Sequence, residues 1–165
     1  MKKNQIITHL SLEPHVEGGF FHRTYQSEHQ TTPTDIEKSR PLLTSIYYLL
    51  SDDSPIGYLH KNRSDIIHYF HSGSPLTYHI IHPDGTIERI VMGNDLASGQ
   101  QLQLIVKGGC WKATELTAGE YGLVSEAVSP GFEYADMELA ERETIQILFT
   151  DLPDELESLI KPAAG

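Results

Sequence analysis

The chain has 165 residues, of which 12 are Lys or Arg and 23 are Asp or Glu, so its formal net charge is −11. This length fits one domain, and a hydrophobic content of 39% excludes the disordered and fibrous classes. The acidic balance disfavours binding to the phosphate backbone of nucleic acids. We therefore expect a single globular domain, residues 1–165, with no nucleic-acid partner.

No signal for a membrane or for secretion can be read from the sequence. The longest apolar runs, such as residues 46–50, fall far short of the roughly 18 residues that cross a bilayer. Met1 is followed by lysines and then by polar residues, where a signal peptide would have an apolar segment. Cys110 is the single cysteine, so neither an internal disulfide nor a Cys-based zinc knuckle can form. We expect a cytoplasmic protein with no membrane partner.

Short elements separated by turns follow one another along the chain. Residues 4–10 carry apolar side chains at helical spacing after a possible Asn4 cap, which predicts a short helix that stops near Pro14. Residues 20–26 are expected to be extended, and the polar residues 27–40 are expected to form a mobile loop. Further short strands are expected at residues 43–50, 66–71, 76–82, 86–92, 102–106, 110–116 and 121–128.

Turn sequences separate these strands at close spacing. The sharpest is Pro-Asp-Gly at residues 83–85, because Pro presets one φ angle and Gly accepts a positive one. Near the C-terminus, residues 140–149 and 153–160 carry apolar side chains at helical spacing, and Pro153 suits a first helical turn. Many short strands with helices at both ends predict an all-β antiparallel sandwich or barrel.

Five of the nine histidines lie within residues 60–82. Histidine is the commonest metal ligand and titrates near neutral pH, so the cluster suggests a metal site or acid/base chemistry. Side chains alternate between the two faces of a strand, which places His68 with Phe70 on one face and His71 on the other. One metal ion therefore cannot bind both histidines without a bulge. Most of the five are expected to be surface residues or hydrogen-bonded core residues.

Several segments, in order along the chain, are similar to one protein family. Residues 57–73, which include His60 and end at Gly73, lie where cupins carry their first motif. The segments HVEGGFF, SIYYLL and PGFEY, which begin at residues 15, 45 and 130, resemble more specifically the uncharacterised cupin family DUF985, or Cupin_5. The resemblance implies a double-stranded β-helix, which is a jelly roll of the RmlC-like type, with short terminal helices and a homodimeric assembly.

The resemblance also implies where a metal would bind in a cupin. The usual site needs two histidines, a carboxylate and a third histidine. In this sequence those positions hold His60, Asn62, Ile66 and Lys112, so one of the four ligands is retained. A protonated lysine has no lone pair for a cation and repels it. We therefore expect neither a metal nor another cofactor at this position.

Polar residues at the motif positions predict a pocket for a small organic molecule inside the barrel. His60, Asn62 and Lys112 should project inward beside His68 and Phe70, which gives a few polar groups on an apolar wall. Lys112 could bind a ligand anion or act as an amine nucleophile. Alternatively, the twist of its strand carries its flexible stem out to solvent.

A cupin of the sugar epimerase type provides the model for catalysis, in which a histidine and a tyrosine exchange protons with a carbon acid. In that reading His60 is the base, Tyr47 is the tyrosine acid and Lys112 binds the ligand's anion. Asp65 or Glu17 would orient His60. The expected ligand-binding residues are Glu17, Asn62, Asp65, His68, Phe70 and His79.

Three functions stay open at this point, and the sequence does not decide whether the protein is an enzyme. The first is a metal-independent cupin that binds a small metabolite and acts as an epimerase or isomerase. The second is a metal-dependent cupin with displaced ligands, such as His60 with His68 or His79. The third is a non-catalytic sensor or storage-like protein whose barrel binds a metabolite.

Overall fold

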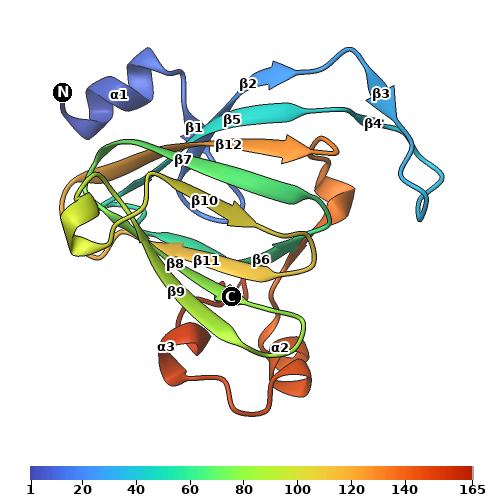
Figure 1. The fold of residues 1–165 in the computed structure, drawn as a ribbon. Helices are drawn as coiled ribbons and strands as arrows, with labels where there is room; N and C mark the ends of the chain where they lie inside the picture. Colours follow the sequence, from blue (N-terminus) through green and yellow to red (C-terminus); the bar gives the residue numbers. More distant parts are fainter. Residues whose placement is uncertain (165) are drawn as a thin grey trace.

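Two antiparallel β-sheets face each other in the computed structural model, which describes residues 1–164 (Figure 1). The six-stranded sheet has the strand order β1-β2-β5-β12-β7-β10, and the five-stranded sheet has the order β13-β6-β11-β8-β9. The six-stranded sheet consists of β1 (Glu13–Pro14), β2 (Phe20–Gln26), β5 (Thr44–Ser51), β7 (Asp65–Gly73), β10 (Gln103–Val106) and β12 (Tyr121–Ser129).

The remaining elements complete the second sheet, an arm and the ends of the chain. The five-stranded sheet consists of β6 (Ile56–Asn62), β8 (Leu76–Ile81), β9 (Ile87–Met92), β11 (Trp111–Glu115) and β13 (Met137–Leu139). The short strands β3 (Gln30–Thr31) and β4 (Arg40–Pro41) pair with each other at the end of an arm beyond the six-stranded sheet (Figure 1). The helices are α1 (Lys3–His9), α2 (Arg142–Leu148) and α3 (Asp154–Glu157), with 3-10 turns η1 (Leu96–Ser98) and η2 (Tyr134–Asp136).

The helices pack on the outer faces of the two sheets. On the six-stranded sheet, Ile6 of α1 packs with Leu49 and Leu123. On the five-stranded sheet, Ile145 of α2 and Leu156 of α3 are fully buried in a cluster that includes residues of β6, β8 and β11. Because the helices lie outside, side chains of the strands fill the space between the two sheets.

None of the helices in the described part of the chain has the length and apolar character needed to cross a membrane.

Each strand predicted from the sequence is present, but β6 and the short strands β1 and β13 were not predicted. The residues of β6 that face inward include His60 and Asn62, whereas Leu59 is fully buried on the outer side of its sheet. The inward positions of β6 hold polar residues, where a core strand normally has apolar ones. The sequence therefore does not show the alternating hydrophobic pattern that predicts a strand. The segment 27–40, predicted as a loop, instead contains β3 and the first residue of β4, which pair with each other. The helices at residues 142–148 and 154–157 are shorter than predicted.

Apolar side chains fill one part of the interior between the sheets. Tyr78 and Met92 come from the five-stranded sheet, and Tyr48 and Val124 come from the six-stranded sheet. All four are at most 2% exposed. The other part of the interior contains ionisable side chains and an open cavity, which is described below.

The packing of the C-terminal helices predicts a stability difference between two substitutions. Leu156→Ala removes a fully buried side chain and leaves a void, so it should lower the free energy of unfolding by about 2–5 kcal/mol. Ile147→Ala, at a side chain that is 80% exposed, should change it by less than about 0.5 kcal/mol. Urea denaturation followed by circular dichroism measures both values. Equal effects of the two substitutions would contradict the docking of α3 on the sheet.

Candidate functional site

A row of side chains crosses the inner face of the six-stranded sheet. Strand pairing places Arg23 of β2 beside Ile46 of β5, Ile46 beside Glu126 of β12, and Glu126 beside His68 of β7. Val124 and Val128 share the inner face with Glu126, because alternate residues of a strand point the same way. Glu126 is thus a carboxylate on an otherwise apolar strand face.

On the opposite sheet, a β-bulge sets the position of His60. Lys112 of β11 pairs with His60 of β6, and Thr114 pairs with Gly57, so β6 contains one additional residue between these pairs. The bulge frees the backbone of Tyr58 from the regular ladder. Its carbonyl oxygen accepts a hydrogen bond from Nδ1 of His60 at 2.7 Å, which leaves Nε2 of the imidazole to face the interior.

The loop before β2 brings Glu17 to His60 through backbone contacts. The Tyr58 amide donates a hydrogen bond to the carbonyl oxygen of Glu17 at 2.6 Å. Gly18 follows with a φ of 92°, and a Cβ atom there would lie 2.1 Å from the carbonyl oxygen of Ile56. This close approach therefore requires glycine. It fixes the carboxyl group of Glu17 against β6.

Glu17 and His60 face each other in a buried environment. Oε2 of Glu17 lies 3.1 Å from Nε2 of His60, and both side chains are at most 7% exposed. Burial raises the pKa of Glu17 to about 7. Burial, together with the Lys112 ammonium, lowers the pKa of His60 to about 4. Near neutral pH the imidazole is therefore neutral, and Glu17 is present in both its protonated and its ionised form.

A second buried chain of polar groups joins the two sheets. Nζ of Lys112 donates to Nε2 of His68 at 3.1 Å, and Nδ1 of His68 lies 3.2 Å from Oε1 of Glu126. Burial lowers the pKa of His68 to about 4, so this histidine is a neutral bridge between an ammonium and a carboxylate. Burial by itself would raise the pKa of Glu126, but Lys112 and His68 outweigh it and hold that pKa well below its usual range.

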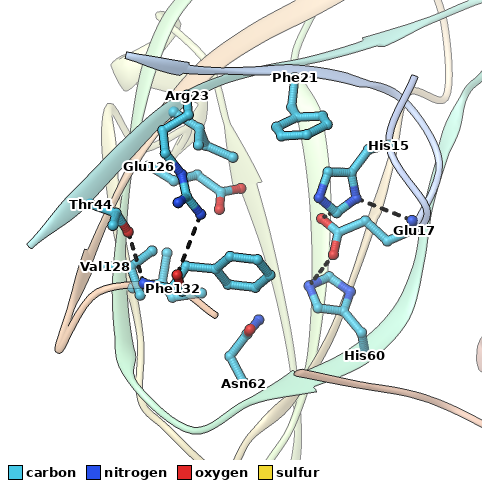
Figure 2. A pocket seen from close by; sticks show the side chains of 12 residues that line it. His15, Glu17, Phe21, Arg23, Thr44, His60, Asn62, Glu126, Val128 and Phe132 are labelled. Atoms are coloured by element: carbon cyan, nitrogen blue, oxygen red, sulfur yellow. Dashed lines mark hydrogen bonds and ion pairs between the residues drawn. The ribbon is translucent and has the colours of Figure 1, made fainter. Parts of the chain in front are cut away.

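A narrow cavity opens beside these two groups, with about 30 Å³ of space that the centre of a water molecule can reach and about 420 Å³ when the open space at its mouth is included (Figure 2). Glu17 and His60 lie on one side of it, and Arg23 lies on the other, with the rings of Phe21 and Phe132 between them (Figure 2). The lining residues are His15, Glu17, Phe21, Arg23, Thr44, Ile46, His60, Asn62, Ile66, Glu126, Val128 and Phe132.

The structure places most of the predicted site residues in or next to this cavity. Glu17, His60 and Asn62 line it. His68, Phe70 and Lys112 point into the barrel and are buried behind the lining residues. Lys112 is 3% exposed, so its stem does not turn out to solvent. Its amine contacts His68 and lies 4.0 Å from Glu126, which leaves Arg23 as the cation in the cavity wall.

Three predicted site residues lie outside the cavity. Tyr47 faces the outer side of β5, where its ring packs edge-on to His71, so the inward tyrosine of this strand is Tyr48. The hydroxyl of Tyr48 donates to the carbonyl oxygen of Gly18 at 2.8 Å. These placements follow from strand alternation, which the choice of Tyr47 did not respect.

Asp65 and His79 are also directed away from the cavity. Asp65 lies at the start of β7, where it accepts hydrogen bonds from Lys107 and from the Gly108 amide. His79 pairs with Ala113, a residue of the outer cluster, and its Nε2 lies 2.7 Å from the carboxylate of Glu115. A metal site that uses His60 with His79 is therefore not formed.

Glu126, His15 and Arg23 were not identified from the sequence as site residues. Glu126 had a readable signal, because a carboxylate stands between Val124 and Val128 on a strand face that is otherwise apolar. Arg23 and His15 had none, because β2 is mostly exposed and the loop at His15 reaches the cavity only through tertiary contacts.

The donor set at the usual cupin position does not fit a metal ion. Ile66 stands in place of the carboxylate and Lys112 brings an ammonium. The Nε2 atoms of His60 and His68 already face Glu17 and Lys112. Within residues 1–164, no three His, Cys, Asp or Glu side chains converge as ligands.

A family model described as Cupin superfamily (DUF985) matches residues 4–140. The chain belongs to this family. An uncharacterized protein of Saccharomyces cerevisiae, YML079W, is 34% identical over 174 residues, which cover 96% of this chain and 80% of the yeast protein. These matches confirm the resemblance that was inferred from the sequence motifs.

Solved structures confirm the double-stranded β-helix fold of this cupin. Protein SO0799 from Shewanella oneidensis is 33% identical, with a TM-score of 0.88 over 98% of this chain and 99% of its own. A hypothetical protein from Leishmania major is 29% identical, with a TM-score of 0.86 over 97% of both chains. An oxalate decarboxylase structure, at 16% identity and a TM-score of 0.56, shares the fold alone.

The buried chain Lys112–His68–Glu126 predicts that this cupin is strongly destabilised when its cation is removed. Lys112→Met leaves the carboxylate of Glu126 buried without a counter-ion, so the free energy of unfolding should fall by about 3–5 kcal/mol. The double variant Lys112→Met/Glu126→Gln removes both charges and should lose less. Lys107→Met, at an exposed ion pair, should change the free energy of unfolding far less than Lys112→Met does. A single variant as stable as the wild type would contradict this role of Lys112.

The raised pKa of Glu17 predicts a pH-dependent effect of Glu17→Gln. Between pH 4.5 and about 7 the folded cupin holds a proton on Glu17 that the unfolded chain releases, so this group's stabilising contribution falls as pH rises. Glutamine does not ionise, so Glu17→Gln has no such decrease in stability. The free energy of unfolding of the variant minus that of the wild type should therefore increase from about pH 5 to about pH 8. The groups that act on Glu17, namely His15, Lys112 and Glu126, are present in both proteins.

Urea denaturation at the two pH values measures this difference. Glu37→Gln, at an exposed position, serves as the matched control, and its stability relative to the wild type should be the same at both pH values. A constant difference for Glu17→Gln as well would show that Glu17 ionises in the folded cupin as it does in water.

Proposed function

We propose that this cupin binds a small organic molecule in the cavity and exchanges a proton with it through the Glu17–His60 pair. The observation that carries the proposal is the pair itself, in which a carboxyl and an imidazole lie 3.1 Å apart in the wall of a cavity that opens to the surface. With the pKa of Glu17 at about 7, the protonated and ionised states of the pair are both populated near neutral pH. A general acid or base is most effective under that condition.

Each residue of the pair has a separate task in this proposal. The ionised carboxylate of Glu17 accepts a proton from a carbon acid or a hydroxyl of the bound molecule, and the protonated carboxyl returns it. His60, held by the Tyr58 carbonyl, accepts through Nε2 a hydrogen bond from the carboxyl group when Glu17 is protonated, and so orients that form. The role of base thus lies with Glu17 supported by His60, and a tyrosine acid is not required. The proton transfer corresponds to the epimerase or isomerase class.

Lys112 and His68 support the cavity from behind. They hold Glu126 as a carboxylate, so the negative charge in the cavity wall is constant while Glu17 titrates. The homodimer implied by the family resemblance and the cytoplasmic location stay predictions.

The proposal predicts isotope exchange into the molecule that the protein retains on purification. Native mass spectrometry of protein prepared without chelator should detect a bound organic molecule. When that molecule is incubated with the protein in D₂O, it should gain deuterium. Glu17→Gln and His60→Gln should slow the exchange about 10²- to 10⁴-fold. Arg89→Gln, at an exposed position of β9, should leave the rate unchanged.

Three outcomes would contradict the proposal in different ways. Tight binding without deuterium gain would identify a non-catalytic binding protein. A stoichiometric transition metal bound through His60 would favour the metal-dependent alternative. Exchange that survives Glu17→Gln would show that another group transfers the proton.

A further inference from the structure

Arg23 is a cation in the cavity wall that no carboxylate neutralises. Its Nη1 donates to the side-chain oxygen of Gln26 at 2.8 Å, and its Nη2 donates to the carbonyl oxygen of Phe132 at 3.3 Å. Both acceptors are neutral, and three of the five N–H groups of a guanidinium remain without a partner in residues 1–164. The side chain is partly buried and held in place by β2.

The other ionisable groups of the cavity are balanced among themselves. The negative charge of Glu126 is matched by Lys112 through His68, on the side of Glu126 away from Arg23. Arg23 and Glu126 belong to strands that are separated by β5, so their backbones lie about 10 Å apart. When Glu17 is protonated, the Glu17–His60 pair carries no net charge. The charge that remains in the cavity is that of Arg23, which favours an anionic ligand.

The chemistry of this cation favours a carboxylate over a phosphate. A planar guanidinium binds a carboxylate through two parallel hydrogen bonds, and one cation matches its single charge. A phosphate monoester has close to two charges at neutral pH, and Arg23 by itself would leave the second one unpaired.

The rest of the wall indicates the body of the ligand. Phe21 and Phe132 point into the space between Arg23 and the Glu17–His60 pair (Figure 2). Their rings favour an apolar, preferably planar group. A molecule held by Arg23 at one end would therefore extend towards the Glu17–His60 pair.

Asn62 adds one polar requirement. Its Oδ1 atom is buried and accepts no hydrogen bond within the described part of the chain, although the residue lines the cavity. A buried acceptor without a partner is costly, so a ligand with a hydroxyl group would satisfy it.

We propose that the ligand is a small organic acid whose carboxylate pairs with Arg23, whose apolar body lies between Phe21 and Phe132, and whose hydroxyl contacts Asn62. This inference rests on the proposed function, because it names the class of molecule that the Glu17–His60 pair meets. The carboxylate sets the orientation, and the carbon that bears the exchangeable proton is directed towards Glu17.

Isothermal titration calorimetry with matched probes tests the inference. Mandelate carries all three features, mandelamide lacks the charge, phenylacetate lacks the hydroxyl, and phenyl phosphate replaces the carboxylate. Wild-type protein should bind mandelate at least about tenfold more tightly than mandelamide. Phenylacetate should bind severalfold more weakly than mandelate, and phenyl phosphate should bind more weakly than both.

The variants assign the preference to Arg23. Arg23→Gln should bind mandelate and mandelamide equally, and Arg23→Lys should retain part of the preference because it keeps the charge without the planar donor pair. Arg89→Gln removes the same charge from an exposed position on β9 and should behave as the wild type. Circular dichroism and the unfolding temperature show whether each variant is folded.

Each result decides the inference separately from the proton-transfer proposal. Equal binding of mandelate and mandelamide by the wild type would overturn the organic-acid class and leave the cavity as a binding site for neutral molecules. Tightest binding of phenyl phosphate would overturn the carboxylate assignment. A preference for mandelate that survives Arg23→Gln would overturn the role of Arg23. No binding of any probe at millimolar concentration would overturn the inference, whereas isotope exchange into the retained molecule would still test Glu17.

Discussion

The interior of this cupin depends on the neutralisation of charge between its two sheets. Lys112 comes from the five-stranded sheet and Glu126 from the six-stranded sheet, and neutral His68 connects them. An isolated charge in such a place would be strongly unfavourable, so the two sheets are tied by the requirement that both ions stay together. Where another cupin could place a metal ion between the sheets, this chain places its own ammonium.

This internal ion pair also gives the carboxyl groups of Glu126 and Glu17 different pKa values. Glu126 is held ionised by a cation behind it, whereas Glu17 has no such partner and its pKa is raised by burial to about 7. Two carboxyl groups that line one cavity therefore differ in their protonation state at the same pH. That difference gives one of them a constant charge and leaves the other free to exchange a proton.

Much of the architecture could be predicted from the sequence, because turn residues and strand alternation are local properties. Alternation correctly placed His68 and Phe70 on the inner face of β7, and the family motifs placed His60 and Lys112 inside the barrel. Strand β6 was missed because its inward residues are polar. For His79 and Tyr47, the inward direction was assumed without fixing the register of their strands.

The composition of the site could be predicted only in part, because its geometry arises from contacts between distant segments. Glu17 meets His60 through hydrogen bonds of the Tyr58 backbone, and no residue type marks such a contact in the sequence. Arg23 lies on a mostly exposed strand, where an arginine normally indicates nothing more than a solvated face. Glu126 is different, since a carboxylate among inward valines is visible once the alternation of β12 is counted.

The bulge in β6 and the close approach of Gly18 position Glu17 and His60 independently of the side chains that shape the rest of the cavity. Main-chain atoms fix where the carboxyl–imidazole couple sits, so substitutions at Phe21, Ile46 or Phe132 would reshape the cavity without displacing that couple. Under the proposed function, separate parts of the polypeptide would therefore set reactivity and selectivity.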